Sequence, residues 1–247
     1  MRRLLVINPN TGQATTQRLK EWLNGLLPSH VHLDCITARF GAPYIACEAS
    51  HAVAGHALLD AWAAHLQSGV ELPDGIVIAC FGDPGLFALR EVSACPVTGL
   101  AEASFMQAAL HGSFAIVTGG VRWKPMLQRL ALGLGYASLL THIEVVEQDG
   151  AALLADREMA LRVLSKASEQ AAASGAKAVI LGGAGLAGYA SALQADCPLP
   201  LIDSVSAALD VYLDNRMPVS STSINRFHTP WNGLSQAMGQ FNAWSEE

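Results

Sequence analysis

The segment VIACFGDPGL, residues 77–86, places a cysteine directly after an apolar run. The run is typical of a buried strand, and the Gly-Asp-Pro-Gly sequence that follows is typical of a turn. A thiol can remove a proton from a substrate carbon or return one to it. Because parallel sheets carry their chemistry at the carboxyl ends of the strands, we expect Cys80 to be an accessible catalytic residue. We interpret Asp83, which precedes a proline, as a turn or capping residue.

The other four cysteines are less well placed for chemistry. We interpret Cys35 as a core thiol within a strand, and Cys95 and Cys197, each followed by proline, as structural residues at the amino ends of strands. Cys47 follows the second expected strand in a loop, where it could supply a second thiol. Five scattered cysteines without CxxC spacing argue against a disulfide scaffold and a structural zinc site, and we expect no metal.

Short runs rich in valine and isoleucine alternate along the chain with longer alanine- and leucine-rich segments of helical period. The expected strands are residues 3–8, 31–37, 75–79, 96–99, 113–118, 141–147, 177–182 and 199–202. The expected helices are residues 12–26, 50–68, 100–111, 122–135, 150–174, 186–195 and 204–215. This alternation predicts the α/β class, with parallel sheets wrapped by helices.

Composition excludes several classes of protein. The chain has 247 residues, of which 51% are hydrophobic and 15% charged, so it can bury one large core or two modest ones. The net charge of -6 comes without a basic patch, so we expect no nucleic-acid partner. No apolar run reaches membrane-spanning length. The first run, LLVI, stops at Asn8, too soon for an export signal, and we interpret it as the first strand of a cytoplasmic protein.

The chain also appears duplicated, because three pairs of similar segments occur in the same order. These pairs are LLVINPNTG (4–12) with FAIVTGGV (114–121), VIACFGDPGL (77–86) with ILGGAGLAG (180–188), and CPVTGLAEAS (95–104) with LPLIDSVSAAL (199–209). Two related α/β lobes that face each other would bring both glycine-rich turns into one cleft. The position equivalent to Cys80 in the second half is Gly183, so the symmetric thiol is absent.

These segments resemble the aspartate/glutamate/hydantoin racemase superfamily, in particular its hydantoin and allantoin racemase branch. The resemblance rests on INPNT (7–11), ACFGDPGL (79–86), PVTGLAEAS (96–104), FAIVT (114–118), VILGGAGLAG (179–188) and IDSVSAAL (202–209). It implies two pseudo-symmetric Rossmann-like lobes, with the active site in the cleft between them, no cofactor, and a homo-oligomer. We assign residues 1–98 and 207–247 to the first lobe, with a C-terminal helix packed back on it, and residues 99–206 to the second.

Racemases of this branch use two cysteines on opposite faces of the substrate carbon. The resemblance implies that Cys80 is the first catalytic residue and that Gly183 occupies the position of the second. A further departure lies in GAPYIACEAS (41–50), where related sequences carry an acidic residue near Ala46, so the identity of the substrate stays open.

Proton abstraction from an α-carbon leaves an enolate, whose oxygen needs hydrogen-bond donors already in place. Backbone N–H groups of the glycine-rich turns and a few side chains near the expected cleft are suited to bind the substrate. The predicted substrate-binding residues are Asn10, Thr11, Phe40, Phe81, Gly82, Thr118, Gly119, Gly120, Ala184 and Gly185. Asn10 and Thr11 would hold a ring amide or a carboxylate.

Gly183 has no side chain to transfer a proton, and three interpretations stay open. The first is a racemase relative that binds a hydantoin, allantoin or related α-substituted acid but has lost its second thiol, unless Cys47 or a water replaces it. The second is a single-cysteine decarboxylase similar to arylmalonate decarboxylases, which keep the cysteine of the other lobe. The third is a non-catalytic protein that binds a hydantoin-like metabolite.

Overall fold

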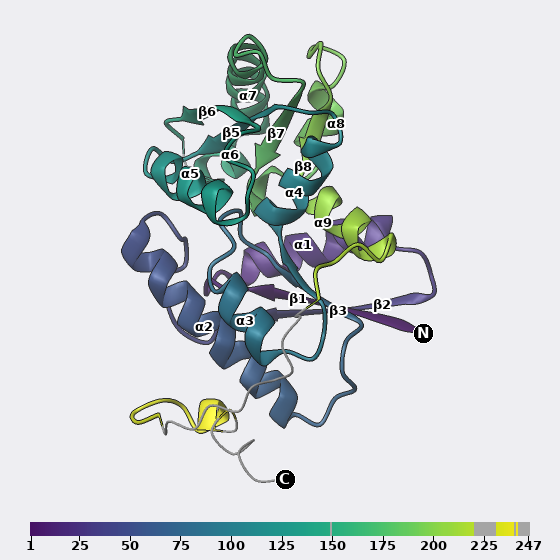
Figure 1. The fold of residues 1–247 in the computed structure, drawn as a ribbon, viewed down its shortest axis with the longest axis vertical. Helices are drawn as coiled ribbons and strands as arrows, with labels where there is room; N and C mark the ends of the chain where they lie inside the picture. The colour runs from purple at the N-terminus through teal and green to yellow at the C-terminus, as the bar shows by residue number, and fades with distance from the viewer. Residues whose placement is uncertain (149, 220–230, 240, 242–247) are drawn as a thin grey trace. The chain divides into compact units, whose positions relative to one another are not determined.

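Within the part of the chain that the structure describes, eight strands form two four-stranded parallel sheets, as the alternation of elements predicts. The computed structural model describes residues 1–148, 150–219, 231–239 and 241 (Figure 1). The chain folds as two compact units, residues 1–79, 84–98 and 217–247 in the first and residues 80–83 and 99–216 in the second.

The sheet of the first unit has the strand order β2-β1-β3-β4. Its strands are β1 (Arg2–Asn8), β2 (Val31–Thr37), β3 (Gly75–Ile78) and β4 (Val97–Gly99). Its helices are α1 (Gln13–Leu26), α2 (Glu48–Gln67) and α3 (Leu86–Val92). The central strands are apolar along their length, with Leu4 to Ile7 and Ile76 to Ile78 buried, as expected of a parallel sheet covered on both faces.

The sheet of the second unit has the equivalent order, β6-β5-β7-β8. Its strands are β5 (Phe114–Gly119), β6 (Leu140–Val146), β7 (Ala178–Gly182) and β8 (Leu201–Asp203). Its helices are α4 (Leu100–Ala109), α5 (Trp123–Gly133), α6 (Gly150–Ala155), α7 (Arg157–Ala172), α8 (Tyr189–Leu193) and α9 (Ser204–Leu213). A short 3-10 helix, η1 (Ala184–Leu186), follows β7.

The two sheet orders map onto each other strand by strand, with β1 equivalent to β5 and β3 equivalent to β7. Each of the three similar segment pairs in the sequence therefore begins in equivalent strands of the two units. The prediction of two pseudo-symmetric α/β lobes is confirmed.

All eight expected strands are present, but three helical assignments differ from the expectation. Helix α3 was not expected; it has only seven residues and begins directly after Gly85, whose backbone is in the left-handed region. The single helix expected over 150–174 is two helices, because the Asp156 side chain accepts a hydrogen bond from the Met159 N–H and starts α7. The helix expected over 186–195 is shortened to Tyr189–Leu193, since Gly188 is again left-handed.

The predicted domain boundaries after residues 98 and 206 stay a prediction, and the compact units differ from them in two places. Residues 80–83 cluster with the second unit, although β3 just before them belongs to the first. Residues 207–216, expected in the first lobe, also cluster with the second unit, where α9 packs on α4. In the C-terminal part, η2 (Ala237–Gly239) packs on α2 of the first unit, and residues 220–230 of the expected long connection 217–233 lie outside the described residues.

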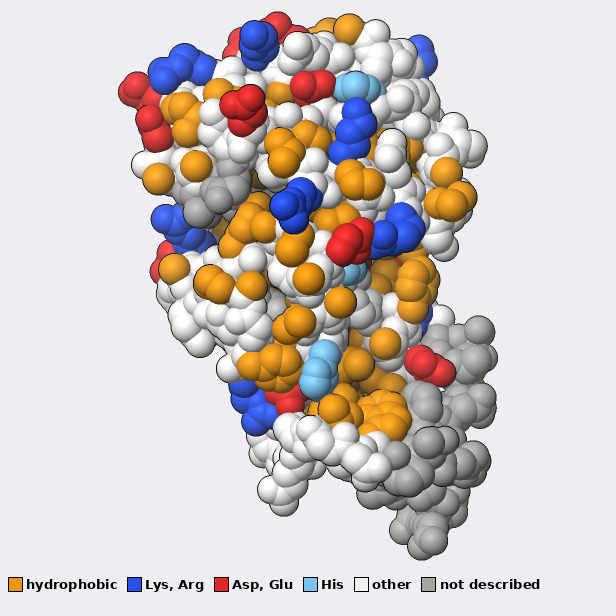
Figure 2. Space-filling view, turned by 90° about the vertical axis from the view of Figure 1, so that its left-hand side faces the viewer, with side chains coloured by type: hydrophobic (Ala, Val, Ile, Leu, Met, Phe, Trp, Pro, Cys, Tyr) orange, Lys and Arg blue, Asp and Glu red, His pale blue; other side chains and the backbone are white. Residues whose placement is uncertain are grey.

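On the face shown in Figure 2, lysine and arginine side chains are interspersed with acidic and apolar ones instead of forming a basic patch. Among the described residues, no helix combines the length and the apolar character needed to cross a bilayer.

Candidate functional site

Cys80 begins a tight turn directly after the buried strand β3. Its carbonyl oxygen accepts hydrogen bonds from the N–H groups of Gly82 at 3.0 Å and Asp83 at 3.1 Å. The residue is only 8% exposed, so the expectation of an accessible thiol is wrong for this structure. Burial raises the pKa of the Cys80 thiol, and the Asp83 carboxylate adds to the effect. The resting form of Cys80 is therefore the thiol and not the thiolate.

The Asp83 carboxylate ties this turn to the amino end of α4. Its two oxygens accept hydrogen bonds from the N–H groups of Ala101 at 2.9 Å and Glu102 at 2.7 Å. The N-cap residue, Gly99, supplies no side chain, and a Cβ on it would lie 2.1 Å from the Asp83 Cγ. Asp83 is thus a capping residue, as predicted, but it caps a helix that begins 17 residues further along the chain.

Asp83 is itself buried, with 3% of its surface exposed, and its backbone is left-handed with φ of 48°. Burial raises the pKa of Asp83 to about 7, with a smaller contribution from the Glu102 carboxylate, against the lowering effect of the N–H groups that it accepts. The carboxyl group therefore changes protonation near neutral pH, one turn away from the thiol.

Phe81 brings the Cys80 turn against the end of β7 within the second unit. A Cβ on Gly182 would lie 2.2 Å from the Phe81 ring, so only glycine leaves room for the ring at that position. The ring also makes an edge-to-face contact with Phe105 at 6.4 Å between centroids. The hydroxyl of Thr118 donates to the Gly182 carbonyl at 2.7 Å. The predicted residues Phe81 and Thr118 therefore both lie next to the residue that precedes Gly183.

Gly183 has a backbone conformation that side chains disfavour, although there is space for one. Its φ is 154° and its ψ 136°, a region adopted almost only by glycine. A Cβ on Gly183 would make its nearest contact at 3.4 Å, with the Leu186 side chain. Its N–H donates to the Ser204 hydroxyl at 3.2 Å. A side chain at position 183 would thus cost backbone strain and not a steric clash.

Several of the predicted N–H donors already have partners within the protein. The Gly82 N–H donates to the Cys80 carbonyl, and the Gly120 N–H donates to the Val146 carbonyl at 3.1 Å. Gly119 is the last residue of β5 and pairs with β6.

Three other predicted donors are open. Among the described residues, the N–H groups of Phe81, Ala184 and Gly185 donate no hydrogen bond.

The INPNT turn of the first unit is organised by Asn8, a residue that the sequence analysis did not single out. The fully buried Asn8 amide donates to the Asn10 Oδ1, the Gly12 carbonyl and the Thr16 hydroxyl. The Asn10 Oδ1 also accepts from the Gly12 N–H at 2.8 Å, so this oxygen serves the turn. The Thr11 N–H donates to the Ala42 carbonyl. The Asn10 Nδ2 makes no hydrogen bond with the described residues.

The last predicted binding residue, Phe40, is half-buried in the first unit. Its ring makes an edge-to-face contact with the His56 ring at 4.9 Å between centroids.

The fold and these motifs can be compared with known proteins. The family model described as Asp/Glu/Hydantoin racemase matches residues 4–211. The chain belongs to this family.

Individual relatives agree with this assignment. The chain is 32% identical over 211 residues to hydantoin racemase from Paenarthrobacter aurescens, a match that covers 85% of this chain and 89% of the relative. The structure of allantoin racemase from Klebsiella pneumoniae has a TM-score of 0.84 and 28% identity, over 98% of this chain and 99% of that one. A Gly74Cys mutant of arylmalonate decarboxylase, with a TM-score of 0.57 and 16% identity over 86% of this chain and 92% of that one, shares the fold alone.

The other four cysteines lie at a helix N-cap, within a strand or in buried positions. Cys47 is the N-cap of α2, and its Sγ lies 3.4 Å from the Ser50 hydroxyl. Cys35 lies in β2, where burial raises its pKa to about 12, and Cys95 and Cys197 are buried. Among the described residues, no group of three or more histidine, cysteine, aspartate or glutamate side chains is arranged to hold a metal ion.

Replacing Asp83 tests the link between the Cys80 turn and α4. We expect Asp83→Asn to lower the free energy of unfolding by about 1–3 kcal/mol, because an amide NH₂ cannot accept the second N–H of α4, whereas both oxygens of the carboxyl group keep lone pairs for it in either protonation state. Between about pH 4 and the Asp83 pKa of about 7, the folded wild type holds a proton that the unfolded chain has released. Stability due to Asp83 is therefore lost as pH rises through this window.

The free energy of unfolding, measured with urea, should therefore differ less between wild type and Asp83→Asn at about pH 7.5 than at about pH 4.5. The matched control is Asp196→Asn, at an exposed position, which should leave stability unchanged at both pH values. A difference that widens with rising pH would contradict the raised pKa of Asp83.

Proposed function

We propose that this protein is a hydantoin- or allantoin-type racemase homologue that transfers a proton at the substrate α-carbon through Cys80 and needs no cofactor. The observation that carries the proposal is the Cys80 turn, which adjoins the Gly183 turn within one compact unit of a racemase-family chain. The names of the similar hydantoin and allantoin racemases supply the substrate class.

In the proposed reaction, the Cys80 thiolate removes the α-proton, and the electron pair passes to the neighbouring carbonyl oxygen as an enolate. The open N–H groups of Ala184 and Gly185 are the proposed donors to that oxygen. The free Nδ2 of Asn10 would bind a ring carbonyl or carboxylate. Return of the proton from the Cys80 thiol restores the starting enantiomer, since Gly183 has no group that could deliver a proton to the opposite face.

A one-sided site predicts isotope exchange without inversion. In D₂O, one enantiomer of a 5-substituted hydantoin should lose its α-proton signal in NMR while its optical rotation stays nearly constant. Because Cys80 rests as the thiol, the exchange rate should rise about tenfold per pH unit through the neutral and mildly alkaline range, after subtraction of the rate without protein.

The control variants for this exchange reaction are two single cysteine changes. Cys80→Ser should lower the exchange rate by about 100-fold or more, whereas Cys47→Ser should leave it unchanged. Exchange that survives in Cys80→Ser, or that disappears in Cys47→Ser, would disprove the assignment of the proton to Cys80.

Restoring a thiol at position 183 should restore racemisation. We expect Gly183→Cys to increase the rate of loss of optical rotation by about 100-fold or more, because a second thiol would face the substrate from the other side. Space for the Cβ is available, and the strained φ should cost about 1–3 kcal/mol of stability.

Gly183→Ala is the matched control for Gly183→Cys, since it adds the same Cβ and the same strain without a thiol. It should lose a similar amount of stability and gain no racemisation. A folded Gly183→Cys that is inert on hydantoins and allantoin would remove the main support for a racemase.

A single-cysteine decarboxylase is the second candidate, and the resting thiol form of Cys80 favours it. Loss of CO₂ from a disubstituted malonate would leave a carbanion that takes its proton from the thiol. Because the thiol is already the populated form, such CO₂ release should be nearly independent of pH near neutrality, in contrast to the exchange reaction. Tight hydantoin binding with neither reaction would instead indicate a non-catalytic binder. The expected homo-oligomer and a cytoplasmic location stay predictions.

A further inference from the structure

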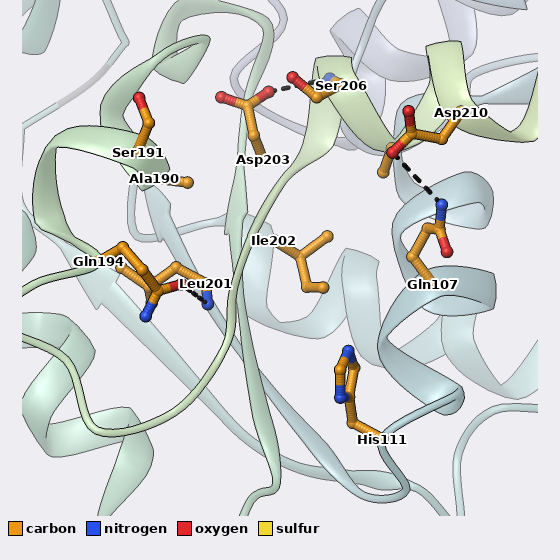
Figure 3. Close-up of a pocket in the computed structure, with 11 residues that line it drawn as sticks. Gln107, His111, Ala190, Ser191, Gln194, Leu201, Ile202, Asp203, Ser206 and Asp210 are labelled. Carbon is orange, nitrogen blue, oxygen red and sulfur yellow. Dashed lines mark hydrogen bonds between the residues drawn. The ribbon is translucent and has the colours of Figure 1, made fainter.

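A groove of about 400 Å³ runs along the free edge of β8 in the second unit (Figure 3). β8 is the last strand of its sheet, and β7 is its one neighbouring strand among the described residues. Ala190 and Ser191 from the α8 side line one wall, and Gln107 of α4 and Asp210 of α9 line the other. Because residues of these helices flank β8 on both sides, the edge of the strand forms the floor of the groove.

The outer edge of β8 presents backbone groups to this groove. The Val179 N–H of β7 donates to the Pro200 carbonyl, and the register pairs β7 with β8 in parallel. In a parallel ladder alternate residues bond to the same neighbour, so Pro200 and Ile202 face β7. Leu201 and Asp203 consequently direct their N–H and C=O groups away from β7.

Of these four outward groups, one N–H is occupied by a side chain, and one carbonyl and one N–H are open. The Leu201 N–H donates to the Gln194 Oε1 at 2.9 Å. Among the described residues, the Leu201 carbonyl and the Asp203 N–H make no hydrogen bond. An extended polypeptide carries both a donor and an acceptor at the spacing of these two groups, as in the addition of a strand to a sheet edge.

The equivalent edge in the first unit shows what covers such a strand. There the Val97 N–H of β4 donates to the Pro218 carbonyl at 3.2 Å, and Arg90 Nη2 donates to the Val97 carbonyl at 2.8 Å. The covering segment belongs to the chain itself, and its Met217 is buried. Val97 corresponds to Leu201 in the duplicated sequence, where the Gln194 side chain takes the place of the chain segment at the N–H. The Leu201 carbonyl, unlike that of Val97, has no hydrogen-bond donor among the described residues.

We propose that the β8 groove binds an extended segment of another protein, with apolar residues toward the half-buried Leu201 and basic residues toward the exposed Asp210. Side chains of an extended segment alternate between the two walls, so basic side chains that point toward Asp210 can alternate with apolar ones that point toward the other wall. The Asp203 carboxylate is committed to three backbone N–H groups, including that of Gly188, whereas the exposed Asp210 has Gln107 as its hydrogen-bond partner at 3.5 Å.

The same groove disfavours direct pairing of β8 with the β8 of a second copy. Residues of α8 line one side of the strand and residues of α4 and α9 the other, so the edge lies on the groove floor. Two edges recessed in this way cannot approach to the spacing of about 5 Å that strand pairing requires. A projecting peptide segment can enter the groove.

The peptide acetyl-Val-Arg-Val-Arg-Val-amide is a suitable probe, used with the full-length protein labelled with ¹⁵N. We expect the amide resonances of Leu201 and Asp203 to shift on titration, with saturation. Methylation of the central valine nitrogen removes its N–H donor and should weaken binding about tenfold. Glutamate in place of both arginines should weaken it by at least as much.

Asp210→Asn should weaken binding of the parent peptide about threefold, and the matched variant Glu169→Gln, on the exposed side of α7, should leave it unchanged. Equal affinity for the parent and the methylated peptide would overturn the proposal. So would shifts confined to residues outside the groove, or an oligomer in solution that protects the Asp203 amide and excludes the peptide. None of these outcomes depends on the reaction proposed for Cys80.

Discussion

The buried Asp83 carboxylate fixes the position of the proposed catalytic thiol. The turn from Cys80 to Asp83 is short, and its internal hydrogen bonds are those from the Gly82 and Asp83 N–H groups to the Cys80 carbonyl oxygen. Within the second unit, this turn is held in place by the pair of hydrogen bonds from α4 to the carboxylate and by the Phe81 ring packed against Gly182. A buried carboxylate with these partners tolerates little displacement, since each lost hydrogen bond leaves a desolvated group.

In each half of the chain a carboxylate accepts the first N–H groups of a helix, but it comes from a different position in the two halves. In the second half, Asp203 is the N-cap of α9, and its carboxylate accepts the N–H groups of Val205 and Ser206 and that of Gly188 in the preceding turn. At the equivalent cap position, α4 has Gly99, and the carboxylate comes from the turn instead. In both halves one carboxylate connects a glycine-rich turn to a helix that follows it in the chain. The connection is therefore the same in the two halves, whereas the residue that supplies the carboxylate differs.

The sequence was sufficient to predict the sheets, because continuous apolar runs of valine and isoleucine between turn residues are typical of buried parallel strands. It also predicted the turn after Cys80 and the capping role of Asp83. It could not predict that α4 is the helix that Asp83 caps, because that contact joins residues distant in sequence. The burial of Cys80 was missed for the same reason, since exposure depends on what packs over the turn and not on the turn itself. Asn8 carried a signal, two asparagines around a proline, but only the buried hydrogen bonds of its amide assign it to the turn.

Burial of Cys80 has a consequence for the direction of the chemistry. In a pair of thiols of which one is a thiolate, either residue can act as base while the other acts as acid, and the two faces of the substrate are equivalent. A single buried thiol is different, because its acidic form is populated at rest and its basic form must be generated against a raised pKa. Such a site is better suited to give a proton to a carbanion formed by another route than to create the carbanion. If Cys80 is the proton-transfer residue proposed above, a glycine at position 183 would leave only one face of the substrate within reach of a thiol.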